Sequence, residues 1–173
     1  MDLSFRLASQ PDCGALAALI NSAYRGESSQ TGWTTESHLL DGLRTDEADL
    51  RLIVGLPHSN VLMAYFENKL IGSVHLEKRS DEVCYLGMFT VNPALQTQGI
   101  GKTLLANAEK FAHEIYKSSL MQMSVITARR ELIEWYERRG YRRTGKLIPF
   151  PVHEKFGVLK VESLEMEYLE KSL

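Results

Sequence analysis

The chain has 173 residues, of which 44% are hydrophobic and 24% charged, and its 20 Lys and Arg against 22 Asp and Glu give a formal charge of −2. This near-neutral balance excludes the dense positive charge with which proteins bind nucleic-acid backbones. No stretch approaches about 18 consecutive apolar residues, and the N-terminus lacks a basic segment followed by an apolar one. We therefore expect one globular domain over residues 1–173, located in the cytoplasm and without a membrane span.

The two cysteines, Cys13 and Cys84, are far apart and have no Cys or His at metal-binding spacing. This usage is typical of a reducing compartment, and it predicts no metal site.

The first part of the chain reads as one strand followed by helices. Alternation over residues 5–7 predicts a short strand, and a Ser-x-x-Asp capping pattern at 9–12 predicts a helix start. Apolar residues spaced three and four apart over 16–24 give that helix one buried face. A second helix is predicted over 34–43, with Thr34 or Thr35 as its cap.

From residue 61 the hydrophobic pattern changes to a period of two. Segments 61–66, 70–77 and 83–91 predict three antiparallel strands joined by short turns. The spacing then returns to that of an amphipathic helix over 100–115.

The last part of the chain alternates again between strands and helices. The predicted order is a strand over 121–126, a helix over 131–139, a strand from Tyr141, a loop over 146–157 and a last strand over 164–168. The chain as a whole therefore has an α/β (α+β) pattern, with helices on the faces of a mixed sheet.

One segment carries chemistry, where a strand ends at Val91 and a loop with two glycines opens into the long helix. The first amides of a helix have no internal partner, and the helix dipole favours negative charge there. Gly99 and Gly101 leave those amides accessible, since a Cβ would stand between them and a phosphate oxygen. We therefore predict a phosphate-binding loop.

Two better-known phosphate motifs do not fit this loop. A nucleotide P-loop needs glycine where Gln96 stands, and a dinucleotide fingerprint needs Gly or Ala where Leu104 stands. The pattern that does fit is Gln-x-x-Gly-x-Gly after Val-x-Pro.

This pattern resembles the GNAT superfamily of acyl-CoA-dependent N-acetyltransferases, and Tyr136-x-x-x-Gly140-Tyr141 matches a second GNAT motif in the expected order. The resemblance implies the GNAT fold, with a mixed, mostly antiparallel sheet of about seven strands. It also implies acetyl-CoA as cofactor and direct acetyl transfer to a primary amine of a small molecule or peptide in a ternary complex. One departure is Arg129, where many family members have Asn.

The resemblance assigns the cofactor to the glycine loop and the strand before it. Gly87 interrupts that strand and predicts a bulge, where the strand would splay and its backbone would meet the pantetheine arm. The expected cofactor-binding residues are Met88, Phe89, Thr90, Val91, Gln96, Thr97, Gln98, Gly99, Ile100, Gly101, Lys102 and Thr103.

Catalytic roles follow from the same resemblance. Tyr136 matches the family tyrosine that protonates the leaving thiolate, and a phenol of pKa about 10 is protonated at pH 7. The alternative is a plain core aromatic. For the base, His75 and Glu77 share one face of their strand, and Glu36 is a third candidate.

Substrate contacts are expected from two variable segments outside the motifs, residues 26–44 and 146–157. Trp33 and Glu36 follow a Gly- and Ser-containing stretch, and Phe150 and His153 lie in the loop with two prolines. A non-catalytic CoA-binding module of the same fold stays open, because no base is evident. An exposed last strand would allow a homodimer.

Overall fold

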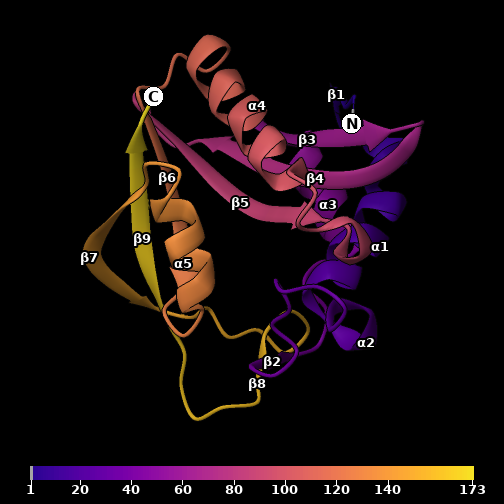
Figure 1. The fold of residues 1–173 in the computed structure, drawn as a ribbon, viewed down its shortest axis with the longest axis vertical. Helices are drawn as coiled ribbons and strands as arrows, with labels where there is room; N and C mark the ends of the chain where they lie inside the picture. The colour runs from indigo at the N-terminus through magenta and orange to yellow at the C-terminus, as the bar shows by residue number, and fades with distance from the viewer. Residues whose placement is uncertain (1) are drawn as a thin grey trace.

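A seven-stranded sheet forms the centre of the molecule (Figure 1). The computed structural model describes residues 2–173. Neighbouring strands are antiparallel except β5 and β6, which are parallel, so the predicted fold class is confirmed. In spatial order the strands are β1 (Ser4–Leu7), β3 (Ser59–Phe66), β4 (Lys69–Lys78), β5 (Val83–Val91), β6 (Leu120–Ile126), β9 (Glu165–Ser172) and β7 (Arg142–Pro149).

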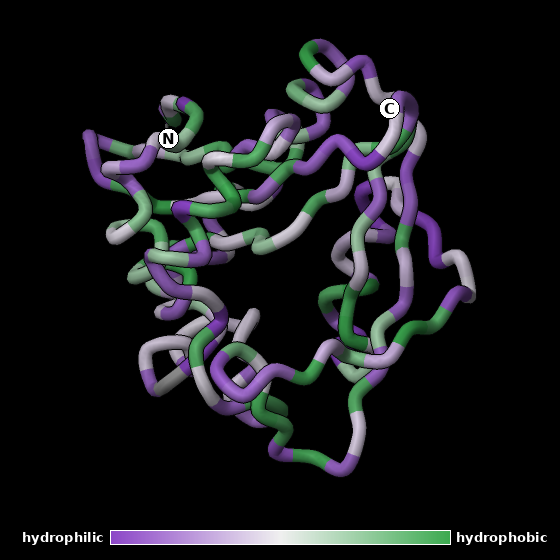
Figure 2. The backbone as a smooth tube through the Cα atoms, turned by 180° about the vertical axis from the view of Figure 1, so that it is seen from behind, coloured by the Kyte–Doolittle hydropathy of each residue, from purple (hydrophilic) through white to green (hydrophobic). Residues whose placement is uncertain are grey.

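Helices cover both faces of this sheet. Along β3, Leu62 and Ala64 point into the core beneath α4 (Ile100–Glu114) and α5 (Arg130–Glu137), whereas Val61 and Met63 point into the core beneath α1 (Cys13–Tyr24) and α3 (Glu47–Gly55). Hydrophobic residues accordingly recur along the strands (Figure 2). Among residues 2–173, no helix combines the length and apolar character needed to cross a membrane. The helices are α1 (Cys13–Tyr24), α2 (Gly26–Ser29), α3 (Glu47–Gly55), α4 (Ile100–Glu114) and α5 (Arg130–Glu137), with 3₁₀ turns at Gln10–Asp12 and Pro93–Leu95.

The parallel strands β5 and β6 separate soon after they begin. They pair only through Val83–Tyr85 of β5 and Leu120–Gln122 of β6. A bulge then interrupts β5, because the register passes from His75 opposite Gly87 to Ser73 opposite Thr90. The predicted splay is therefore present, and it opens the sheet at its middle.

The predicted helix over residues 34–43 is wrong, and a helix at Glu47–Gly55 was missed. Residues 34–39 form turns, and Leu40–Asp41 is a two-residue strand, β2, that pairs with β8 (Val158–Leu159). Tertiary contacts override the local spacing, since Glu36 is buried in ion pairs and Leu40 belongs to a core cluster. The missed helix, α3, is capped by Asp46, which accepts from the Asp49 amide at 2.7 Å.

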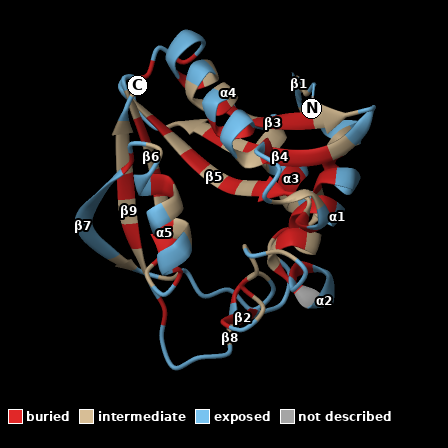
Figure 3. Cartoon of the chain, viewed as in Figure 1, coloured by how far each residue is buried: buried red, intermediate tan, exposed pale blue. Residues whose placement is uncertain are grey.

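Two predictions for the C-terminal part also need correction. The loop predicted from Lys146 begins only after Pro149, because β7 continues that far. β7 is almost wholly exposed (Figure 3), so its sequence shows no apolar alternation. The last strand, β9, lies between β6 and β7 and is not the exposed edge that we expected to allow a homodimer.

Candidate active site

The glycine loop and the start of α4 present free backbone amides. Gly99 is the N-cap of this 15-residue helix and has φ of +83°, a left-handed conformation that glycine adopts without strain. The first helical bond runs from the Thr103 amide to the Gly99 carbonyl, so the amides before Thr103 have no acceptor within the helix. This end of α4 therefore fits an anion.

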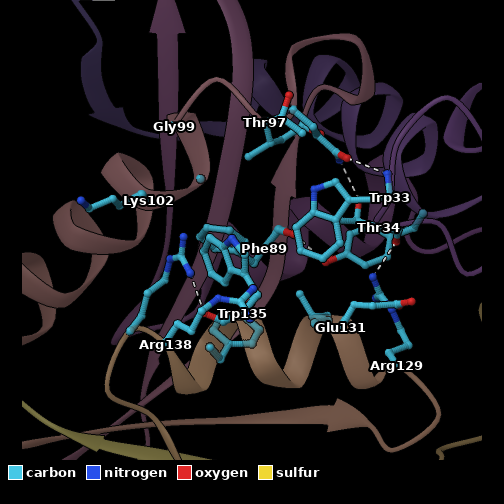
Figure 4. A pocket seen from close by; sticks show the side chains of 17 residues that line it. Trp33, Thr34, Phe89, Thr97, Gly99, Lys102, Arg129, Glu131, Trp135 and Arg138 are labelled. Carbon is cyan, nitrogen blue, oxygen red and sulfur yellow. Dashed lines mark hydrogen bonds between the residues drawn. The ribbon is translucent and has the colours of Figure 1, made fainter.

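A cavity of about 490 Å³ begins at these amides. It lies between the N-terminal end of α4, helix α5 and the segment that carries Trp33, with Phe89 of β5 at its centre (Figure 4). Trp135 forms part of its wall and lies against Gly101, where an added Cβ would stand 3.4 Å from the indole. We call this space the first cavity.

The Gln96 side chain holds residues Trp33 and Thr34 in the wall of the first cavity. Its side-chain oxygen accepts from the Trp33 amide at 2.9 Å, and its side-chain nitrogen donates to the Thr34 hydroxyl at 2.7 Å. Gly32 allows this approach, since a Cβ there would lie 2.7 Å from the same oxygen. The motif glutamine thus positions the N-terminal segment beside the loop.

A second cavity, of about 360 Å³, opens between β5 and β6 where the strands separate. The bulge of β5 forms its boundary, and Met88 there has φ of +45°. Tyr24 of α1 holds the bulge, because its hydroxyl donates to the Phe89 carbonyl at 2.7 Å. The predicted bulge thus lies at Met88 and Phe89, immediately after Gly87.

The two cavities share a wall. Five residues line both of them, namely Tyr24, Phe89, Arg129, Leu132 and Tyr136. Tyr136 is 3% exposed and packs edge-on against Phe89, and burial raises the pKa of its phenol well above 10. Because its pKa is raised, the phenol stays protonated at neutral pH. Its hydroxyl has no hydrogen-bond partner within residues 2–173, so it is available as a donor.

Comparison with protein-family models decides the family of the chain. A model of the acetyltransferase (GNAT) family matches residues 17–141, most of the sequence. This chain belongs to the GNAT acetyltransferase family. Enzymes of this family use acetyl-CoA, and no curated protein gives a significant sequence match.

Solved structures share the fold over nearly the whole chain. An N-acetyltransferase from Staphylococcus aureus Mu50 is 14% identical, with a TM-score of 0.73 over 99% of this chain and 98% of that one. The Salmonella typhimurium protein yncA, solved with its cofactor acetyl-CoA, is 17% identical, with a TM-score of 0.69 over 100% and 95%. A spermidine N-acetyltransferase SpeG chimera from Vibrio cholerae and hSSAT is 14% identical, with a TM-score of 0.72 over 99% and 96%. At such identities the similarity shows the GNAT fold.

The residue that departs from the family pattern, Arg129, is part of a buried ionic cluster. Glu36 accepts from Arg25 at 2.5 Å through one oxygen and from Arg129 at 3.0 Å through the other. Arg129 also donates to the Thr34 carbonyl at 2.8 Å. All three charged residues are less than 10% exposed, so this GNAT chain uses the position to join its N-terminal segment to α5.

The predicted cofactor residues divide into two groups. The first cavity of this GNAT fold is lined by Phe89, Val91, Gln96, Thr97, Gly99, Gly101 and Lys102. The other five do not line it: Met88 lines the second cavity, Thr90 and Ile100 are buried, and Gln98 and Thr103 are exposed on the loop and helix.

Of the three predicted bases, His75 and Glu77 line neither cavity, whereas Glu36 lines the second. His75 stands behind Gly87, where a Cβ would lie 3.7 Å from its Nδ1, and it exchanges a 2.9 Å hydrogen bond with Ser59. Burial lowers the pKa of His75. Glu77 is paired with Arg79 at 3.1 Å.

The predicted substrate residues are likewise separated. Glu36, Phe150 and His153 line the second cavity, whereas Trp33 lines the first. Arg44 ends the segment 26–44 that was expected to contact the substrate, but it was not singled out, and Tyr24 was assigned only to a helix face. Neither residue has a local signal, because the first lies outside any motif and the second fits a plain apolar stripe.

Proposed function

We propose that this protein binds acetyl-CoA in the first cavity and transfers its acetyl group directly to a primary amine in the second. The observation that carries the proposal is the shared wall, where Tyr24, Phe89 and Tyr136 line both cavities. An amine in one cavity would meet a thioester in the other at this wall. The amide bond forms as the carbon–sulfur bond breaks, leaving CoA thiol and N-acetyl product.

The N-terminal end of α4 fits the pyrophosphate of the cofactor. The amides of Ile100, Gly101 and Lys102 point out of the helix without an internal acceptor, and the dipole favours an anion there. Arg138 and Arg139 line the same cavity and add positive charge for phosphate groups. Bound acetyl-CoA supplies the thioester carbonyl that the amine attacks.

The bulge of β5 is the proposed source of carbonyl polarisation. The extra residue of a bulge is unpaired in the strand ladder, so the N–H of Met88 or Phe89 can donate a hydrogen bond to a ligand. A preorganised donor to a developing oxyanion contributes about 3–4 kcal/mol to catalysis. The Tyr24 bond to Phe89 keeps this backbone in place.

Two proton transfers complete the reaction. Tyr136 donates its phenolic proton to the departing thiolate, since its pKa is raised by burial and it is protonated at neutral pH. We assign to His75 the role of the base that takes a proton from the substrate ammonium group, through a water molecule beside Gly87. Gly87 has no side chain to block this path. The lowered pKa of His75 keeps this imidazole neutral at pH 7. Glu77 is the second candidate.

Ligand-dependent unfolding tests the cofactor site. Acetyl-CoA at 100 times its dissociation constant should stabilise the native state by about 2.7 kcal/mol and raise Tm by several degrees, whereas ATP should have no effect. An unchanged Tm in the presence of acetyl-CoA would reject both the acetyltransferase proposal and its alternative, a non-catalytic CoA-binding module.

Turnover separates the enzyme from the binding module. Release of CoA thiol is followed across a panel of primary amines. Tyr136→Phe should lower kcat at least tenfold and keep the affinity for acetyl-CoA, while Tyr168→Phe, outside both cavities, should change neither. An equal kcat in Tyr136→Phe would reject the general acid, and release of no thiol with any amine would favour the module.

Three coarser features belong to the same proposal. We propose that residues 1–173 act as one domain, supported by a sheet that takes strands from both ends of the chain. We propose a cytoplasmic location, which two free, buried cysteines support. A homodimer stays a prediction, for which β7 and β1 are the available sheet edges.

A further inference from the structure

The second cavity has an unusual charge for a site that takes an amine. Its lining contains one carboxylate, Glu36, and two arginines, Arg44 and Arg129. An acceptor recognised through its ammonium group alone would need a carboxylate free to pair with it, because like charges repel in a partly desolvated site.

Glu36 is not free for such a pairing. Both of its oxygens are engaged by buried guanidinium groups, one from Arg25 and one from Arg129. This cluster of one carboxylate and two arginines carries a net charge of +1. Arg25 also has two buried nitrogens, Nε and Nη2, without a partner among the described residues, so the cluster has donors in excess.

Arg44 adds a second positive charge, with which no carboxylate of residues 2–173 forms an ion pair. Within residues 2–173, no carboxylate lies within 4.0 Å of its guanidinium and no group accepts a hydrogen bond from it, and the guanidinium lies over the Tyr24 ring, 5.6 Å from the ring centroid. Only its backbone amide is held, by Asn21 at 2.7 Å. The guanidinium of Arg44 is therefore a half-buried cation that faces the cavity and is free to bind an anion.

Tyr24 connects this cation to the reacting centre. Arg44 lies over its ring, and the Tyr24 hydroxyl bonds the bulged Phe89 carbonyl at the wall between the cavities. An anion on Arg44 would thus sit on the α1 side of a cavity of about 360 Å³, whose other side reaches Tyr136. That volume suits one small molecule bearing both groups.

We infer that the acceptor is an amino acid-like molecule, with an anionic group bound by Arg44 and its amine directed to the wall shared with the cofactor. The inference rests on the proposed function and specifies its substrate class. Carboxylate and the tetrahedral phosphonate or phosphinate share the chemistry that a guanidinium recognises, with two parallel hydrogen bonds. The amine nitrogen forms the amide as the carbon–sulfur bond breaks, and the products are an N-acetyl amino acid and CoA.

Matched acceptors test the class. CoA thiol release is measured with the twenty L-amino acids, with their carboxamides, with aminoalkyl phosphonates, and with spermidine and cadaverine as anion-free amines. The best amino acid or phosphonate should exceed its carboxamide or anion-free analogue at least tenfold in kcat/KM, and the diamines should be poor acceptors. Equal rates for acid and carboxamide, or preference for the diamines, would overturn the inference.

Arg44 variants test the residue. A charge-assisted hydrogen bond lost in Arg44→Gln should raise KM for the preferred anionic acceptor about tenfold to a hundredfold, with the carboxamide unaffected. Arg44→Lys, which keeps the charge, should recover part of the loss. Arg142→Gln removes an exposed arginine outside both cavities and is the control. The acetyl-CoA-induced rise in Tm confirms that each variant is folded, and an unchanged KM in Arg44→Gln would refute the role.

A binding measurement separates this inference from the proposed function. Calorimetry follows binding of N-acetyl amino acids, the expected products, to the CoA-saturated protein and to Arg44→Gln. Amine turnover with product binding independent of Arg44 would refute the anion site and keep the acetyltransferase. Arg44-dependent binding without turnover of any amine would refute the acetyltransferase and keep the anion site.

Discussion

Replacing Glu36 by Gln tests the buried ionic cluster that joins the N-terminal segment to α5. The substitution preserves the shape of the side chain and removes its charge. In the native protein both Glu36 oxygens accept from arginines, Arg25 at 2.5 Å and Arg129 at 3.0 Å. A glutamine keeps one acceptor oxygen and places an NH₂ group against the other guanidinium, so two donors face each other.

The magnitude follows from burial. Arg25 and Arg129 are 5% and 8% exposed, so neither guanidinium can recover its hydration when the carboxylate is lost. Removing one member of a buried ion pair costs about 3–5 kcal/mol, because the remaining charge is left uncompensated. For a chain of this size each kcal/mol lowers Tm by roughly 2–4 °C, which predicts a fall on the order of 10 °C for Glu36→Gln.

Urea unfolding of Glu36→Gln and of a matched control measures this effect. Glu134→Gln alters an exposed glutamate, 3.9 Å from Arg138, with 64% of its side chain accessible. Solvent screens that pair, so its loss should change the free energy of unfolding by less than about 0.5 kcal/mol. If Glu36→Gln costs no more than about 1 kcal/mol, the cluster is not an essential junction and the reasoning from buried charge is wrong.

Two further predictions concern the cavity wall and the N-terminus. Gly32→Ala places a Cβ 2.7 Å from the Gln96 oxygen and should weaken acetyl-CoA binding, measured by calorimetry, about three- to tenfold, because about one hydrogen bond is lost. The control Gly55→Ala, whose Cβ would lie 3.6 Å from its nearest neighbour, should leave the affinity unchanged. Equal affinities in the two variants would contradict this role of Gln96. Hydrogen bonds from Arg6 hold the pKa of Asp12 below its usual value, so this contact stabilises the fold above pH about 4 and is lost as pH falls through the lowered pKa. The Tm difference between wild type and Arg6→Gln should therefore shrink from pH 7 toward pH 2, and a constant difference would refute the assignment.

Much of the fold could be predicted because its elements are set by local spacing. The alternation in β3, β4 and β5 and the amphipathic stripe of α4 each reflect one buried face, which a sequence displays directly. The failures share a cause. β7 is an exposed edge without an apolar face, and residues 34–41 are held by Glu36 and Leu40 through partners distant in sequence. No local pattern shows such contacts.

The candidate site divides in the same way. The phosphate-binding part of the cofactor half lies in one continuous segment, residues 96–102, so the glycine loop and the start of α4 could be identified from residue types and order alone. The acceptor half is assembled from four distant parts of the chain, among them Arg44 after β2 and Phe150 after β7. Its charge depends on which carboxylates are already paired, a property of the folded protein that Glu36 illustrates.

This division bears on the order of chemical events. Direct transfer requires both ligands to be present together, and the wall common to the cavities is where each ligand meets the other. Arg129 lines both cavities and is fixed by Glu36 and the Thr34 carbonyl. Because this arginine is already held, the wall is preformed, and a ligand bound in one cavity adds its own contact surface to the ligand in the other. Acetyl-CoA and the acceptor should accordingly bind with positive coupling, as a sequential mechanism through a ternary complex requires.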